Sequence, residues 1–247
     1  MGSPALPDRI LEWDGCLNVR DLGGLPLADG GTNRGVLVRA DSVTRLSAKG
    51  REALRGYGVR RIVDLRAGDE RLADEVWPEA VEVVSVPISP GGPDDPLWRE
   101  FAEIFDAAAD ADHGLRDVYL AFLERWPALF AAAVAALAAS TDGATVLQCG
   151  AGRDRTGLVA ALLLESAGAA PASIAMDYAL TPPIEGHPGA TAWVMAQVLA
   201  EMSRRHGGAR AYLRNAGLDD ETLAAAVAPL LRSGQSAFGV PGCPGVL

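Results

Sequence analysis

The alternation of short strand-like runs with longer helical patterns constrains the fold of this chain more than any other feature of its 247 residues. Four runs are rich in Val, Ile and Leu and are bounded by Gly or by charged residues; they begin at Gly35, Arg61, Val81 and Thr145. Such runs predict strands that are covered on both faces. We therefore expect an α/β fold: a single domain with a mostly parallel central sheet of about four to five strands, flanked by helices, and a helical C-terminal part.

Helical patterns lie between and after the predicted strands. Ser47 can cap a helix that stops near Gly58, and Pro127 suits the first turn of another. From Thr156 onward no run predicts a strand. The further predicted helices span residues 97–109, 115–124, 127–139, 156–167, 172–179, 190–205 and 219–232.

The ends of the chain have a different composition from its middle. We expect a flexible N-terminus over residues 1–9, one domain over residues 10–232, and a flexible Gly/Pro-rich tail over residues 233–247. The Gly- and Pro-rich stretch from Ser89 to Pro96 is a loop by composition. It is either a plain surface loop or the start of a lid over a site.

Charge and composition exclude several classes of function. The formal net charge is −10, so the chain lacks the general attraction to nucleic acid or to anionic lipid that a basic surface supplies. Three cysteines and three histidines are scattered, which predicts neither a disulfide framework nor a zinc site. We expect no metal and no cofactor.

The sequence shows no pattern typical of a targeting signal or a membrane span. The first residues lack a basic segment that leads into an apolar run, and the apolar stretch 129–139 is shorter than the roughly 20 residues that span a bilayer. We expect no stable membrane insertion and a cytoplasmic location, with secretion by a non-classical route left open. A reducing compartment also suits a working thiol.

The run from Thr145 to Leu164 carries the chemistry. It predicts a strand that ends at Cys149, a tight loop of small residues, and a helix that opens at Arg155. Main-chain N–H groups of such a loop, together with the helix N-terminus, form a cradle for an oxyanion. Gly150 and Gly152 can adopt backbone angles that other residues avoid. The planar fork of Arg155 can hold two phosphate oxygens.

The same positive surroundings favour a thiolate at Cys149, which Thr156 can stabilise with a hydrogen bond from its hydroxyl. Two nucleotide-binding interpretations fail here. A dinucleotide fingerprint needs Gly where Arg155 stands, and the Gly-Lys-Ser/Thr ending of an NTPase phosphate loop is absent. A buried structural thiol at Cys149 is the remaining alternative.

The loop resembles the Cys-x5-Arg-Ser/Thr signature of protein tyrosine phosphatases. It is most similar to the bacterial and fungal branch whose loop reads Cys-x-Ala-Gly-Lys-Asp-Arg-Thr-Gly. Further segments match that branch in consistent order over residues 10 to 232: Asn18–Gly24, Arg39–Asp41, Gly58–Arg66 with Glu70, Asp177–Tyr178, and Tyr212–Leu231.

The resemblance implies a metal-independent phosphate monoester hydrolase with a phosphocysteine intermediate, in which Cys149 is the nucleophile and Arg155 the clamp. The other phosphate-binding residues would be Gly150, Ala151, Gly152, Arg153 and Thr156. It favours a tyrosine or dual-specificity protein phosphatase, with a phosphorylated protein as partner. A phosphatase for phosphoinositides or small phosphate esters is the alternative. A phosphate-binding pseudophosphatase is a third hypothesis, because Gln148 replaces the usual His before the nucleophile.

A general acid must protonate the leaving oxygen of a poor leaving group. The resemblance points to Asp154 inside the loop, although a carboxyl there can also brace the loop by accepting N–H bonds. Asp64 is the second candidate, with a buried ion pair to Arg66 as its competing role. The Trp126-Pro127 pair is followed by Ala128, so it predicts a helix start and not a mobile acid loop.

Four residues near the N-terminus stay open at this point. Asn18, Arg20 and Asp21 either support the phosphate loop or brace the Gly-Gly turn that follows them. Cys16 is either a buried thiol or a partner for oxidised Cys149.

Overall fold

The computed structural model describes residues 9–28, 30–71, 75–89, 94–138, 142–184 and 189–231. Its centre is a five-stranded sheet in the order β1-β4-β7-β5-β6. All neighbouring strands are parallel except β1 and β4, which run antiparallel. The mostly parallel sheet of four to five strands is thereby confirmed. The strands are β1 (Arg20–Asp21), β4 (Leu37–Ala40), β5 (Val59–Asp64), β6 (Glu82–Ser85) and β7 (Ala144–Gln148).

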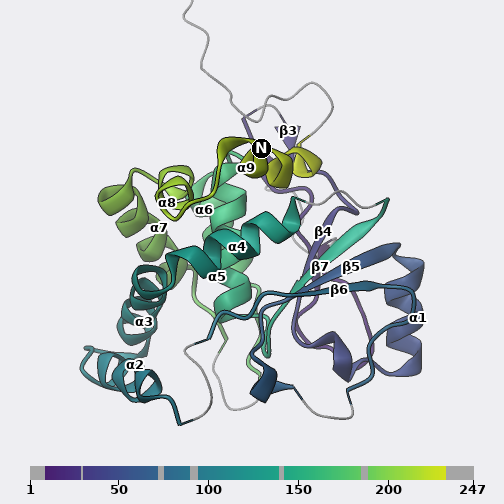
Figure 1. The fold of residues 1–247 in the computed structure, drawn as a ribbon, viewed down its shortest axis with the longest axis horizontal. Coiled ribbons are helices and arrows are strands. Elements are labelled where there is room, and N and C mark those ends of the chain that lie inside the picture. Colours follow the sequence, from purple (N-terminus) through teal and green to yellow (C-terminus); the bar gives the residue numbers. More distant parts are fainter. Residues whose placement is uncertain are drawn as a thin grey trace, which may run out of the picture.

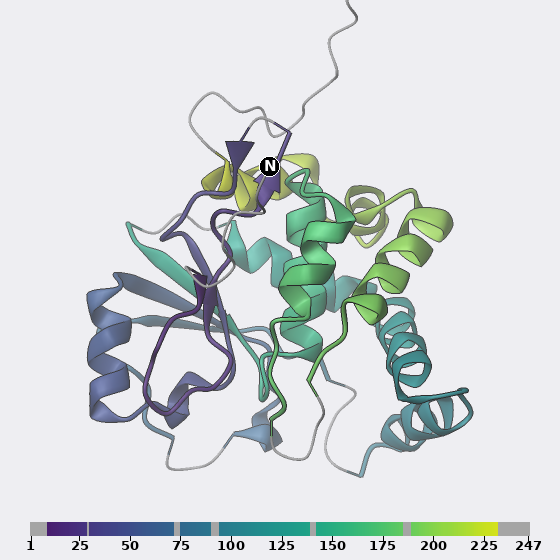
Figure 2. The ribbon, with the colours of Figure 1, turned by 180° about the vertical axis from the view of Figure 1, so that it is seen from behind.

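The sheet lies between two layers (Figure 1): α1 covers one face, and α4 and α5 lead the group of helices on the other. Alternate residues of β7 face the two layers, because side chains along a strand point to opposite sides. Val146 belongs to the core on the α1 side and Leu147 to the larger core on the α5 side. The N-terminal segment lies on the α1 side as well (Figure 2), where Trp13 joins that core.

The described helices are α1 (Ala48–Gly56), α2 (Pro96–Asp106), α3 (Ala111–Arg125), α4 (Pro127–Leu137), α5 (Asp154–Ser166), α6 (Pro171–Tyr178), α7 (Ala192–His206), α8 (Ala209–Asn215) and α9 (Asp220–Val227). Caps fix several starts as expected. Ser47 accepts a hydrogen bond from the Gly50 amide at the start of α1, and Asp219 accepts one from the Thr222 amide at the start of α9.

Some elements differ from the predicted ones. Asp110 caps α3 by accepting a hydrogen bond from the His113 amide, so this helix begins earlier than expected. The final helix is shorter, because Pro229 ends it in a single 3-10 turn, Ala228–Leu230. The sequence did not predict α8, β1 or the small hairpin of β2 (Pro26–Leu27) and β3 (Gly30–Gly31). Residues 1–8, 90–93 and 232–247, which include most of the two predicted flexible ends and part of the predicted loop, lie outside the described residues.

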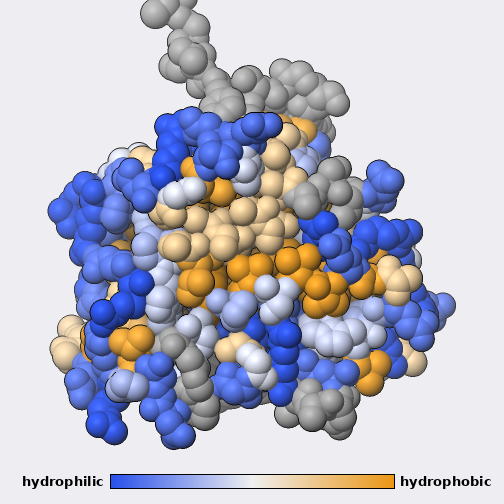
Figure 3. Space-filling view, viewed as in Figure 1, coloured by the Kyte–Doolittle hydropathy of each residue, from blue (hydrophilic) through white to orange (hydrophobic). Residues whose placement is uncertain are grey.

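In the described part of the chain, no single helix is long and apolar enough to cross a membrane. Only α3 and α4 taken together reach that length, and they meet at an angle of 83°. The Ala-rich α4 lies at the front of the molecule, where a band of apolar surface is visible (Figure 3). Its Phe130 and Val134 are fully buried beneath that surface.

Candidate active site

The loop between β7 and α5 lies at the carboxyl end of the central strand. Cys149 follows β7 directly and is 1% exposed. The strands on either side hold the loop in place: the Leu65 amide donates to the Gln148 carbonyl at 2.9 Å, and the Ser42 amide donates to the Gly150 carbonyl at 3.2 Å. The loop therefore has its position fixed by the ends of both neighbouring strands.

Gly152 occupies a position of the loop where no other residue type fits without strain. Its φ is +64°, and a Cβ there would lie 2.5 Å from both the carbonyl carbon and the oxygen of Ala40. Gly150 behaves differently from the expectation, because its φ is ordinary and a Cβ would meet no atom within 4 Å. Only the second glycine is required by backbone geometry.

Three successive loop carbonyls are held from the side of β1 and β4. The Gly150 oxygen accepts from the Ser42 amide, and the Ala151 oxygen accepts from Asn18 Nδ2 at 2.9 Å. The Gly152 oxygen accepts from an Arg39 terminal nitrogen at 2.8 Å. In a planar trans peptide the next N–H points opposite to the carbonyl. The N–H groups of residues 151, 152 and 153 are therefore turned away from β4, as an anion cradle requires.

A buried charge cluster lies behind these contacts. Asp177, from α6, forms ion pairs with Arg9 at 2.9 Å, Arg20 at 3.2 Å and Arg39 at 3.0 Å. Burial alone would raise the pKa of Asp177, but the three guanidinium groups lower it to about 2. Arg20 also donates to Asn18 Oδ1, which connects this cluster to the Asn18 contact with the loop.

Asp21 lies apart from the loop and braces the turn after it. Its carboxylate accepts from the Gly23 amide at 2.7 Å, the Gly35 amide at 2.8 Å and the Tyr57 hydroxyl at 2.5 Å. The three polar residues that the sequence left undecided thus divide. Asn18 and Arg20 support the loop, and Asp21 stabilises the chain around it.

Arg155, in the first turn of α5, is paired with Glu70. Both terminal nitrogens of the guanidinium bind the Glu70 carboxylate, and one of them lies 3.4 Å from the Leu65 carbonyl. Burial lowers the pKa of Arg155, yet the bond to Glu70 and the charges of Cys149 and Glu70 raise it above its usual value. Among the described residues Nε has no partner, so the edge formed by Nε and one terminal nitrogen can meet two phosphate oxygens.

Asp154 is the first residue of α5, and two side chains bind one of its oxygens. The Tyr119 hydroxyl donates to Oδ1 at 2.6 Å, and Arg153 Nε donates to the same atom at 3.0 Å. Tyr119 in turn lies 2.8 Å from the Tyr178 hydroxyl. The Asp154 side chain is 28% exposed, so it reaches solvent beside the loop.

Asp64, the second candidate for the acid, is fully buried in ion pairs. Oδ1 accepts from the Arg66 amide and from its Nε, both at 3.1 Å. Oδ2 is 3.1 Å from a nitrogen of Arg66 and from one of Arg71. Both oxygens are occupied by cationic donors, which favours the ion-pair role over proton transfer.

Gln148 and Thr156 flank the loop with atoms that lack partners. Gln148 Oε1 accepts from the Val43 amide at 2.8 Å. Its Nε2 and the Thr156 hydroxyl are buried without a hydrogen bond within the described ranges, and the expected bond from Thr156 to the sulfur of Cys149 is not formed there. Cys16 donates to the Ser42 carbonyl, and burial raises its pKa, so this thiol stays protonated.

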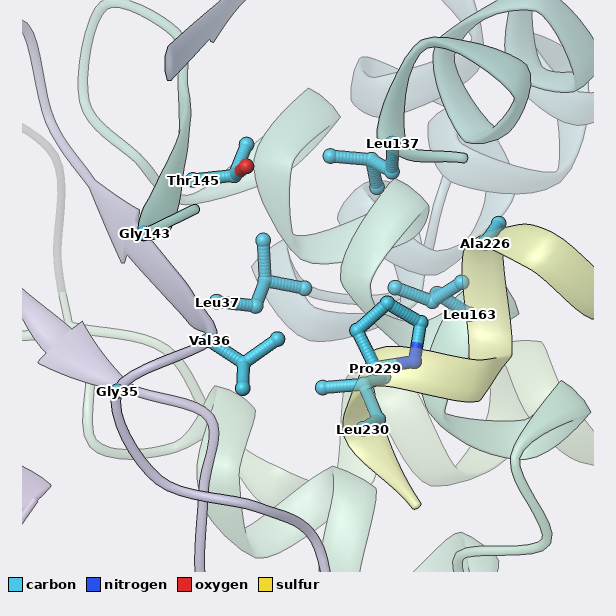
Figure 4. Close-up of a pocket in the computed structure, with 10 residues that line it drawn as sticks. All are labelled: Gly35, Val36, Leu37, Leu137, Gly143, Thr145, Leu163, Ala226, Pro229 and Leu230. Carbon is cyan, nitrogen blue, oxygen red and sulfur yellow. The ribbon is translucent and has the colours of Figure 1, made fainter. Parts of the chain in front are cut away.

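The structure has one pocket beside the loop and another away from it. One of about 450 Å³ opens beside Gly150 and is lined by Ser42, Thr44, Arg45, Arg51, Arg66, Glu70, Glu75 and Val76. The other, of about 260 Å³, lies near the opposite end of β4 and β7, beside the turn after α9 (Figure 4). Leu37, Leu137, Leu163 and Leu230 line it, and none of these carries reactive chemistry. In the described ranges, no group of three metal-ligating side chains occurs.

Several residues of this site had no assigned role in the sequence analysis. Glu70, Arg39, Asp177 and Tyr178 belong to the matched segments, but only their contacts show what they hold. Tyr119 carried no signal at all, because it lies in an ordinary helical pattern.

Comparison with known proteins agrees with this geometry. The model of the tyrosine phosphatase family matches residues 11–232. The chain is 26% identical over 216 residues to a tyrosine-protein phosphatase of Nostoc commune, which covers 75% of this chain and 71% of the relative. It is 33% identical over 172 residues to a protein of Cupriavidus necator named provisionally as a tyrosine-protein phosphatase, which covers 68% of this chain and 61% of that one.

Proposed function

Since the chain belongs to the tyrosine phosphatase family, we propose that it hydrolyses phosphate monoesters through a phosphocysteine intermediate on Cys149. The family match confirms the resemblance that its motifs carry. The observation that supports the mechanism most is the loop itself: a buried cysteine at the end of the central strand, main-chain N–H groups turned away from β4, and Arg155 beside the sulfur.

In the first step the thiolate of Cys149 attacks phosphorus in line with the leaving oxygen. A sulfur–phosphorus bond forms as the ester oxygen–phosphorus bond breaks, and the carboxyl of Asp154 gives its proton to the departing oxygen. The loop N–H groups and the Nε edge of Arg155 hold the equatorial oxygens. Glu70 occupies the edge formed by the two terminal nitrogens, so that the guanidinium is held in one orientation.

In the second step water attacks the phosphocysteine. The carboxylate of Asp154, now without its proton, accepts a proton from this water as the new oxygen–phosphorus bond forms. The sulfur–phosphorus bond breaks, and the thiolate is restored. None of these steps requires a metal, so activity should persist in EDTA and disappear with vanadate or thiol alkylation.

Two observations bear on the substrate class that we propose: the surroundings of the loop and the names of the relatives. Both relatives are named for activity on phosphotyrosine, which supports a tyrosine or dual-specificity protein phosphatase. A phosphoinositide or a small phosphate ester is the second candidate. It is supported by Arg45, Arg51 and Arg66, which line the pocket beside Gly150 and lie outside the loop. A reducing compartment, which keeps Cys149 as a thiol, is our prediction for its location.

The decisive experiment is hydrolysis of p-nitrophenyl phosphate by the wild type and by Cys149→Ser, with EDTA present. We expect turnover by the wild type, at least a thousandfold less by the variant, and phosphate trapped on Cys149 after rapid acid quench. Absence of turnover and of trapping in the wild type would identify a pseudophosphatase instead. A panel of phosphotyrosine and phosphoserine peptides against inositol lipids then separates the two substrate classes.

A further inference from the structure

We infer that Tyr119 is a positioning residue that fixes the carboxyl of Asp154 and leaves Oδ2 as the oxygen that carries the transferred proton. The inference rests on the proposed function, because it concerns the acid of that reaction. It adds a residue from α3, a helix far from the loop in sequence.

Asp154 accepts side-chain hydrogen bonds on only one of its carboxylate oxygens. Tyr119 and Arg153 both reach Oδ1, at 2.6 Å and 3.0 Å. A guanidinium can only donate hydrogen bonds, so Oδ1 acts as an acceptor. Oδ2 has no donor within the described residues, and it is the oxygen on which the proton of a neutral carboxyl has room to sit.

The hydroxyl groups of Tyr178 and Tyr119 form a hydrogen-bonded chain that runs in one direction. Burial and the nearby Asp154 charge raise the pKa of Tyr119 well above its usual value, so the hydroxyl stays protonated. Its only hydrogen is directed at Asp154, and the 2.8 Å contact with Tyr178 must therefore be a bond that Tyr178 donates. The order is Tyr178 to Tyr119 to Asp154, which polarises the final donor.

The hydrophobic core holds these two tyrosines rigidly. The rings of Tyr119 and Tyr178 meet edge to face, with centroids 6.2 Å apart. Tyr178 packs against α5 where Gly157 stands, since a Cβ at that position would lie 3.1 Å from the ring. Both tyrosines are 1% exposed or less, so neither hydroxyl can turn to solvent.

The test compares two leaving groups in Tyr119→Phe, which keeps the ring and removes the hydroxyl. General acid catalysis contributes roughly 10²- to 10⁴-fold, and it depends on alignment with the leaving oxygen. We expect kcat for an alkyl phosphate to fall about tenfold while kcat for p-nitrophenyl phosphate, whose leaving group needs little protonation, changes less than about twofold. Across a series of aryl and alkyl esters, kcat should depend more steeply on the acidity of the leaving group.

The matched control is Tyr212→Phe, which also removes a buried tyrosine hydroxyl, one that donates to the Leu123 carbonyl of α3 at 2.7 Å and not to Asp154. It should lose similar stability and keep the wild-type leaving-group dependence. In Asp154→Asn the Tyr119→Phe change should add less than about twofold, since both act on one group.

Two outcomes overturn the inference: equal losses by Tyr119→Phe on both leaving groups, or a full additional tenfold loss in the Asp154→Asn background. Failure of the proposed function itself looks different. The wild type would then show no turnover that depends on Cys149 with either ester, before any tyrosine is changed.

Discussion

Replacing Asp177 by Asn tests whether the buried charge cluster holds the catalytic loop. Asp177 is 1% exposed and forms ion pairs with Arg9, Arg20 and Arg39 at 2.9–3.2 Å. Asn keeps the shape but removes the charge, and its amide group faces cationic donors. Breaking a buried ion pair by removing one partner costs about 3–5 kcal/mol of unfolding free energy.

The lowered pKa of Asp177 points to a stabilisation of the same order. It falls from the usual 3.8 to about 2, and each unit corresponds to about 1.4 kcal/mol, which amounts to about 2 kcal/mol in favour of the folded state. Because the folded-state pKa is the lower one, this stability is present above pH 4 and is lost as the pH falls towards 2. The variant has no carboxyl at this position, so its deficit relative to the wild type should shrink over that window.

The assay is urea unfolding followed by tryptophan fluorescence at pH 7 and at pH values from 4 to 2. At pH 7 we expect a deficit between about 2 and 5 kcal/mol without a change in the slope against urea. Asp220→Asn breaks an exposed ion pair with Arg214 and should cost at most about 0.5 kcal/mol. A pH 7 deficit below about 1 kcal/mol, or one that stays constant down to pH 2, would refute the reasoning.

Two further predictions concern the loop and its clamp. Gly152→Ala should lower kcat/KM for p-nitrophenyl phosphate by more than tenfold and destabilise the fold by more than about 1 kcal/mol, because the left-handed φ and the Ala40 backbone exclude a Cβ. The control is Gly56→Ala in α1, where a Cβ meets no atom within 4 Å. Wild-type kinetics in Gly152→Ala would contradict the loop geometry. Glu70→Gln should weaken vanadate binding and lower kcat/KM about tenfold, since Arg155 loses the charge that orients it. An unchanged vanadate affinity in a titration would show that Arg155 does not need Glu70 to be oriented.

The fold was largely predictable because four of its strands have a clear sequence pattern. The runs at β4, β5, β6 and β7 combine β-branched residues with clear boundaries, and they are the four parallel strands of the sheet. β1 was missed because it is only Arg20–Asp21, two charged residues whose pairing with β4 depends on a partner 17 to 19 positions away. α8 was missed because it has seven residues and no side-chain cap.

The site was predictable where chemistry is local in sequence and hidden where it is not. Cys149, Asp154 and Arg155 lie close together in sequence, in the loop and in the first turn of α5, so their spacing alone suggested a phosphate cradle. Tyr119 lies 35 positions before Asp154, and the pair meets only because the fold brings this side chain of α3 to the start of α5. No local pattern encodes such a contact. The roles of Asn18 and Asp21 could not be separated either, since the two residues are only three positions apart in sequence and yet contact different partners.

The buried arginines explain how a chain with ten excess negative charges can still hold an anion. Arg39 does not need to touch the phosphate, because it donates to the Gly152 carbonyl and so turns the next amide away from β4, into the cradle. Asn18 does the same one residue earlier. Asp177 keeps Arg39 and Arg20 in place and also cancels much of their charge. The attraction for an anion therefore comes from oriented amides and from Arg155, which stay local and are screened less by salt than a charged surface is.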